Sequence, residues 1–127
     1  MAAERKGSNA RALLESVALV TGDDEIAVSV ITALELAHGL ARADTHERRK
    51  RRQRFLDEIL EAVPVQPITA SIALLAGRID GESQAKGIRI PLADLLIGAT
   101  ALELRYRIGT GNLRHFKLIP HLEVISI

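Results

Sequence analysis

The chain has 127 residues, of which 47% are hydrophobic and 26% charged, the composition of one folded domain and not of a disordered or fibrous protein. It contains no cysteine, which excludes disulfides, thiolate metal sites and a cysteine nucleophile and is typical of a reducing compartment. A net charge of +1 and an aromatic content of 2% argue against a strongly basic nucleic-acid binder and against a base-stacking RNA-recognition sheet. The sequence has no apolar run long enough to span a bilayer, and its first residues are polar. We therefore expect one cytoplasmic domain, residues 1–127, without membrane contact.

Hydrophobic periodicity and turn residues predict short strands that alternate with longer helices. The predicted helices are Ser8–Val17, Thr32–Leu40, Thr45–Ala62, Thr69–Lys86 and Pro91–Tyr106. The predicted strands are Ile26–Val30, Val63–Pro67, Arg107–Gly109 and Leu122–Ile127. Because helices separate the strands, we expect an α/β fold with a parallel central sheet flanked by helices. Ligands bind beyond the carboxyl ends of the strands in such sheets.

Local signals support several of these elements. Ser8 is a candidate cap for the first helix, and Thr32-x-x-Glu35 matches a capping box for the second. The third helix is predicted to bury one face, made of Phe55, Leu56, Ile59 and Leu60.

The stretch from Ile90 to Leu102 is apolar on every side except at Asp94, which predicts a helix nearly enclosed by the fold. An ionised carboxylate there is unfavourable unless it is paired, hydrogen-bonded or bound to a metal, and the first turn lies near the positive end of the helix dipole. Two interpretations stay open. Asp94 either serves the start of a buried helix or belongs to a functional site.

Two further groups of polar residues come after predicted strands. Glu35 lies in a helix entered directly from a strand, although Thr32, Glu35 and His38 also form a stripe typical of a solvated helix face. Thr110 and Asn112 lie in a turn after a strand, where their side chains can bind backbone or ligand atoms. Turn formation alone explains the second group.

Three segments together carry a resemblance to a known family. They are Ser29–Gly39 with Glu35, Ile90–Leu102 with Asp94, and Thr110–Phe116 with Asn112, followed by Ile119-Pro120 and a terminal strand. In this order and spacing they resemble the PIN-domain ribonucleases of the VapC toxin type, and they cover almost the whole chain.

The resemblance implies an endoribonuclease toxin that hydrolyses RNA phosphodiester bonds with Mg²⁺ or Mn²⁺ and is neutralised by a cognate antitoxin protein. It implies that Glu35 and Asp94 are catalytic carboxylates that hold the ions, which suits the preference of such ions for oxygen ligands. Asn112 stands where many members have a fourth acid and supplies an amide oxygen, with Thr110 as an auxiliary group. A homodimer is also implied.

The start of the chain departs from the family pattern. Members normally open with an apolar strand that ends in Asp-Thr or Asp-Ser, and the segment Met1–Gly7 resembles the residues that come just after that aspartate. We therefore expect that the first strand is missing, with roughly eight to ten residues upstream of Met1. This departure leaves an alternative function, a catalytically silent PIN-like interaction module that binds an antitoxin or RNA without cleavage.

A basic run gives a further alternative. Six of the residues from 48 to 54 are cationic: Arg48, Arg49, Lys50, Arg51, Arg52 and Arg54. They form either a solvated helix face or a patch that contacts RNA phosphates or an acidic antitoxin segment, and a generic RNA binder would use the same patch. Arg114 either contacts RNA or covers the turn. His38 and His115 show no zinc-site spacing, so structural roles are favoured for both.

Overall fold

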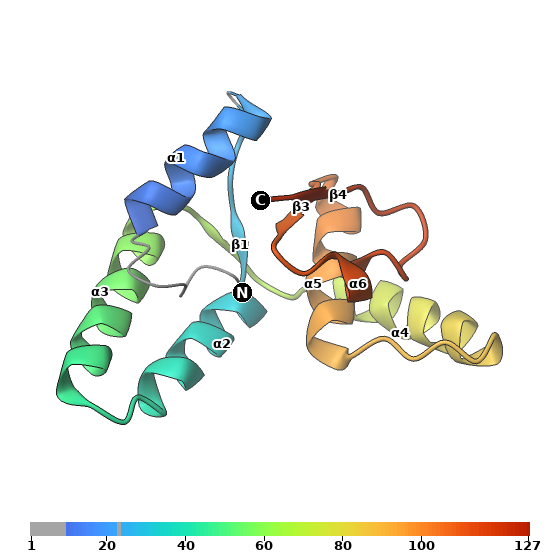
Figure 1. The fold of residues 1–127 in the computed structure, drawn as a ribbon. Helices are drawn as coiled ribbons and strands as arrows, with labels where there is room; N and C mark the ends of the chain where they lie inside the picture. The colour runs from blue at the N-terminus through green and yellow to red at the C-terminus, as the bar shows by residue number, and fades with distance from the viewer. Residues whose placement is uncertain (1–9, 23) are drawn as a thin grey trace. The chain divides into compact units, whose positions relative to one another are not determined.

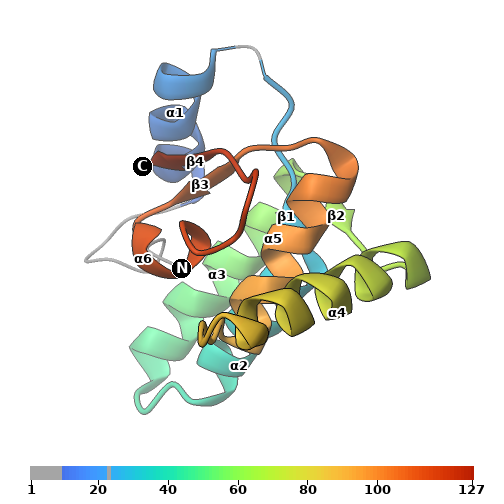
Figure 2. The same cartoon turned by 90° about the vertical axis from the view of Figure 1, so that its right-hand side faces the viewer.

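The computed structural model describes residues 10–22 and 24–127 (Figures 1 and 2). They divide into two compact units, Met1–Gln66 and Pro67–Ile127, called here the first and the second unit. The segment Met1–Gly7 and the cap predicted at Ser8 lie outside the described residues. In the described part of the chain, no helix has both the length and the apolar character needed to cross a membrane.

The described residues of the first unit form three helices and one parallel strand pair. In chain order its elements are α1 (Ala10–Thr21), β1 (Val28–Ser29), α2 (Val30–Ala41), α3 (His46–Ala62) and β2 (Val65–Gln66). Val28 pairs with Val65 and Ser29 with Gln66. Helix α3 packs against both α1 and α2, as Figure 1 shows.

The core of the first unit lies between these helices. Its buried side chains are Ala10, Leu36, Phe55, Leu56, Ile59 and Val63. The prediction that Leu60 belongs to this face is wrong, since its side chain is 46% exposed. Successive residues turn by about 100° on a helix, so Leu60 lies just beyond the edge of the stripe that Ile59 and Val63 form.

Helix α2 starts earlier than the sequence pattern indicates. Ser29 is its N-cap, and the Ser29 hydroxyl accepts a hydrogen bond from the Ile31 N–H at 3.0 Å. The predicted capping box at Thr32 is therefore wrong, because an extended serine at the end of β1 caps the helix and places Thr32, which is buried, inside the first turn. The early helix start also shortens the strand expected over Ile26–Val30.

The second unit has the same kinds of element. These are α4 (Ala70–Ala85), α5 (Leu92–Leu104), β3 (Ile108–Thr110), α6 (Leu113–Phe116) and β4 (Val124–Ser126). Strands β3 and β4 are parallel, with Ile108 opposite Val124 and Thr110 opposite Ser126. Helix α4 packs against α5 and crosses it at an angle (Figure 2), and α6 contacts both α5 and β4.

Helix α5 is enclosed in its middle but not at its start. Its buried residues are Leu95, Gly98, Ala99, Thr100 and Ala101, whereas Leu92 is 70% exposed. The helix ends at Leu104, two residues earlier than predicted, because Arg105 adopts the left-handed conformation with φ 61°.

In both units, two strands that are separated by helices in the sequence pair in parallel. The described strands have two or three residues each and form two separate two-stranded sheets. The α/β character of the prediction is confirmed, and a single central sheet is not.

Candidate active site

Glu35 lies in the helix that begins at the carboxyl end of β1. The Ser29 cap starts α2 directly at the end of the strand, and this places Glu35 in the second turn, with its side chain exposed. In the described part of the chain, the Glu35 carboxylate has no hydrogen-bond or ion-pair partner. The predicted role of Glu35 in a capping box is excluded, and its carboxylate remains available to a ligand.

Asp94 lies in the first turn of α5 and is bound to a histidine from another helix. The Asp94 Oδ2 atom lies 2.7 Å from Nδ1 of His115, which belongs to α6. Both side chains are mostly covered, with 22% of the Asp94 side chain and 28% of the His115 side chain exposed. The other carboxylate oxygen, Oδ1, has no hydrogen-bond partner among residues 10–22 and 24–127.

The carboxylate of Asp94 does not cap its own helix. The N-cap residue is Pro91, and no side chain makes a cap hydrogen bond at this end. Asp94 occupies the third helical position, from which an acidic side chain can reach back to the N–H of the N-cap residue, but proline has no N–H. Asp94 is therefore not a capping aspartate, but it is an acid in the first turn of α5, near the positive end of the helix dipole.

Thr110 and Asn112 form a tight polar turn at the carboxyl end of β3. The Thr110 hydroxyl accepts a hydrogen bond from the Asn112 N–H at 3.0 Å, and the Asn112 side chain caps α6 by accepting from the Arg114 N–H at 3.3 Å. Turn formation thus explains both side chains. The Asn112 side chain is nevertheless exposed, and a carbonyl oxygen that accepts one hydrogen bond keeps a second lone pair.

The second unit therefore brings two of the predicted site segments together. Because His115 lies in the helix that Asn112 caps, its bond to Asp94 joins the start of α5 to the turn after β3. Glu35 belongs to the first unit, so its participation in the same site stays a prediction. Within residues 10–22 and 24–127, no three histidine, aspartate or glutamate side chains gather closely enough to hold a metal ion.

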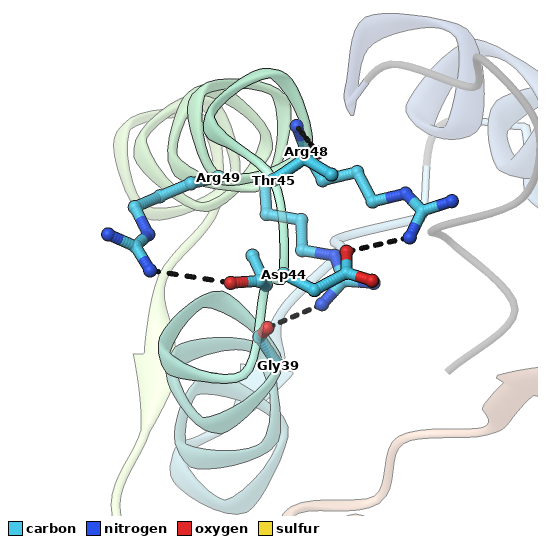
Figure 3. A network of polar contacts seen from close by, with 7 residues as sticks. Gly39, Asp44, Thr45, Arg48 and Arg49 are labelled. Atoms are coloured by element: carbon cyan, nitrogen blue, oxygen red, sulfur yellow. Dashed lines mark hydrogen bonds and ion pairs between the residues drawn. The ribbon is translucent and has the colours of Figure 1, made fainter.

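The basic run lies on α3, and three of its arginines bind groups of the first unit (Figure 3). Arg52 donates to the Gly39 carbonyl at 2.6 Å, in the last turn of α2, and Arg49 donates to the Ala43 carbonyl at 3.3 Å. Arg48 forms an ion pair with Asp44 at 2.7 Å. These arginines hold the end of α2 and the following loop against α3, since the last carbonyls of a helix lack partners within it.

The ion pair also affects the titration of its acid. The hydrogen bond from Arg48, together with the positive charge of that guanidinium, lowers the pKa of Asp44 below its ordinary value of 3.8. Both partners are well exposed, so the pair orders the loop more than it stabilises the fold.

The remaining cations of the run differ from these three. Lys50, Arg51 and Arg54 are exposed and have no hydrogen-bond or ion-pair partner in the described part of the chain. The side chain of Arg114, beside the Asn112 turn, is also exposed and without such a partner there. These four side chains stay available for contact with an RNA or an acidic segment.

Sequence reasoning did not find the contact between His115 and Asp94. The two members of the pair are separated by 21 positions and lie in different helices, so no local spacing indicates the contact. A usable signal was the requirement that an acid on an apolar helix be paired. His38, by contrast, is exposed on α2.

Comparison with known proteins decides the family. Residues 2–120 match the family model described as the PIN domain. The chain belongs to the PIN-domain family. It is 30% identical over 104 residues to a Rickettsia bellii protein named Ribonuclease VapC, a match that covers 82% of this chain and 78% of the relative.

Solved structures show the PIN-like fold as well. VapBC2 from Rickettsia felis, bound to a DNA fragment from its promoter, matches with a TM-score of 0.78 and 26% identity over 90% of this chain and 84% of the other. VapBC-5 from Mycobacterium tuberculosis, a member of a family of toxin-antitoxin systems, matches with a TM-score of 0.70 and 25% identity over 80% of this chain and 79% of the other. The resemblance that the three sequence segments indicate is confirmed.

Proposed function

We propose that this PIN-domain protein is the toxin of a toxin-antitoxin pair and acts as a metal-dependent endoribonuclease that hydrolyses RNA phosphodiester bonds. The observation that carries the proposal is the carboxylate of Asp94, which is held on one oxygen by His115 and leaves the other oxygen unused. Family membership and a relative named Ribonuclease VapC support the same reaction.

The side chains present suit a hard divalent cation. Mg²⁺ and Mn²⁺ prefer carboxylate, amide and water oxygens. Asp94 offers one unbonded oxygen and Glu35 an exposed carboxylate, and Asn112 offers an exposed amide oxygen. We propose that Glu35 and Asp94 are the ligands, that Asn112 contributes directly or through an ordered water, and that Thr110 is auxiliary.

The protein's own part in the reaction is to hold ligands and substrate in place. A divalent ion at these carboxylates, when bound, would supply positive charge for the reacting phosphate and lower the pKa of an attacking water. Glu35 follows the carboxyl end of β1, where ligands bind in parallel sheets, and Asp94 lies in the first turn of α5. Among the cations of the basic run and the Asn112 turn, Lys50, Arg51, Arg54 and Arg114 are open to the RNA backbone, whereas Arg48, Arg49 and Arg52 are engaged within the first unit.

The same proposal covers the fold and the partners. We propose that residues 1–127 form one domain in which the β1–β2 and β3–β4 pairs belong to one parallel central sheet flanked by helices. We also propose a cognate antitoxin protein as partner, a homodimer as the assembled toxin and the cytoplasm as its compartment. The VapBC complexes among the similar structures support the antitoxin.

The experiment that tests this function is cleavage of a structured RNA by the full chain with Mg²⁺ or Mn²⁺. We expect cleavage that a chelator abolishes and that Asp94→Asn and Glu35→Gln each reduce by about a hundredfold or more, because each removes a charged ligand. Glu61→Gln, at an exposed acid on α3, is the matched control and should leave the rate unchanged.

Other outcomes point to the two alternatives. Antitoxin binding without cleavage under any metal would support the silent interaction module. Salt-sensitive RNA binding that persists with chelator, again without cleavage, would support a generic RNA binder. Either result would overturn the enzyme proposal.

A further inference from the structure

The imidazole of His115 is the only described side chain that makes a hydrogen bond or ion pair with the Asp94 carboxylate. The separation of 2.7 Å between Nδ1 and Oδ2 is at the short end of the range for hydrogen bonds to charged groups. Both side chains are mostly covered, so water competes poorly for this bond.

The chemistry of the pair decides which atom donates. An ionised carboxylate can only accept hydrogen bonds, so the Nδ1–H group of His115 donates the hydrogen bond and Oδ2 accepts it. The bond therefore occupies Oδ2 and leaves Oδ1 as the oxygen available to a ligand. No backbone N–H of a capping box holds the carboxylate in its place, because Pro91 removes the one that such a box would use.

The backbone that carries His115 is held in place by its surroundings. The neighbouring Phe116 is buried in the core of the second unit, and Asn112 caps the helix. The His115 carbonyl accepts a hydrogen bond from the Leu118 N–H at 3.1 Å, which closes the next turn of the chain. A donor on so constrained a backbone restricts the rotation of the Asp94 carboxylate.

We propose that His115 is a positioning residue for Asp94, holding Oδ2 so that Oδ1 stays oriented toward the metal that the proposed function requires. The inference rests on that function and adds a residue to it. Hydrogen bonds of this kind fix the orientation of ligating side chains, and their loss typically weakens metal affinity or activity by about 10- to 100-fold.

The test compares two substitutions that differ in one donor. His115→Asn keeps an N–H close to the position of Nδ1, because the asparagine amide nitrogen is the same number of bonds from the backbone. His115→Leu fills similar space without a donor. His46→Leu, at an exposed histidine that starts α3, is the control for loss of a histidine elsewhere.

The first readout is the dissociation constant for Mn²⁺ by titration calorimetry on the full chain, at a temperature where each variant is folded. We expect His115→Leu to weaken Mn²⁺ binding by about tenfold or more and His115→Asn by about threefold or less. The rate of RNA cleavage should fall in the same order. His115→Ala carries the same expectation as His115→Leu and replaces it if the leucine variant does not fold.

The outcomes separate this proposal from the one it rests on. Equal Mn²⁺ affinity in the wild type and in the variant without a donor would overturn the positioning role while leaving the nuclease proposal in place. Equal loss in His115→Asn and His115→Leu would also overturn it, because the ring's packing would then be the important property. A wild-type chain that neither binds Mn²⁺ nor cleaves RNA would overturn the proposed function, and the positioning role with it.

Discussion

Gly98→Ala should destabilise the protein, although alanine is the better helix former. Gly98 is buried in the middle of α5. A Cβ built there would lie 2.3 Å from Cδ1 of Ile119 and 3.4 Å from Cδ2 of Leu122. Carbon atoms pack at about 3.5–4.0 Å, so the Ile119 methyl would have to move by about 1 Å or more.

The surroundings of Ile119 limit that movement. Its side chain is 3% exposed and belongs to the core of the second unit, together with Phe116 and Ala99. Overpacking of a core typically costs about 1–3 kcal/mol, and the helix propensity of alanine offsets up to about 1 kcal/mol of this. We expect a net loss of about 1–2 kcal/mol in the free energy of unfolding.

Gly81 provides the matched control. It lies inside α4, and an added Cβ would meet nothing within 4 Å, so Gly81→Ala should stabilise the protein by about 0.5–1 kcal/mol. Urea denaturation followed by far-UV circular dichroism measures both changes. Ile119→Val, which removes the clashing methyl, should partly rescue Gly98→Ala in a double-mutant cycle. Equal stabilisation by the two alanines would refute the packing argument.

Three further outcomes are expected in the first unit. Arg52→Ala should lower the free energy of unfolding by about 1 kcal/mol, because a half-buried charged donor to the Gly39 carbonyl is lost. The control Lys50→Ala should change it by less than about 0.5 kcal/mol. Equal effects of the two substitutions in urea denaturation would contradict the contact. Carboxyl NMR titration should place the pKa of Asp44 below 3.8, and Arg48→Ala should return it toward that value; an unchanged midpoint would show that Arg48 is not the cause. Because the folded-state pKa is lowered, any stabilisation by this ion pair is present above the unfolded-state pKa and is lost as the pH falls through the folded-state value. Asp44→Asn should therefore lower the free energy of unfolding near neutral pH and leave it unchanged in strong acid.

Much of the helical structure is determined by local signals. Thr45 and Thr69 directly precede the helices α3 and α4, and each hydroxyl accepts a hydrogen bond from the N–H three residues later. These caps make the helix starts predictable to within a residue. Strands β1, β2 and β4 are shorter than the sequence pattern predicts, whereas β3 has the predicted length and is shifted by one residue. A strand exists only where a partner supplies its ladder, and partners are distant in the sequence.

The two acids of the proposed site are noticeable in the sequence, but the histidine that contacts one of them is not. Glu35 and Asp94 stand out from the apolar residues around them, and the structure confirms their helices. The contact from His115 depends on how α6 packs against α5, which no spacing in the sequence encodes. The basic run is only partly interpretable for a similar reason. Arg49 and Arg52 bind carbonyls at and beyond the end of another helix, and that end has to be located first.

Some polar side chains satisfy backbone groups at the ends of helices, and Asp94 does not. Asn112 satisfies the N–H group at the start of α6, and Arg52 satisfies a carbonyl at the end of α2. Asp94 occupies a position where an acid would ordinarily be used in the same way, but Pro91 takes away the donor. A carboxylate left without that partner, on a largely apolar helix, must be satisfied by another side chain or by a ligand, because an unpaired charge there is unfavourable. His115 satisfies one of its oxygens, and the oxygen that remains unused is the main reason why we propose a cation site at Asp94.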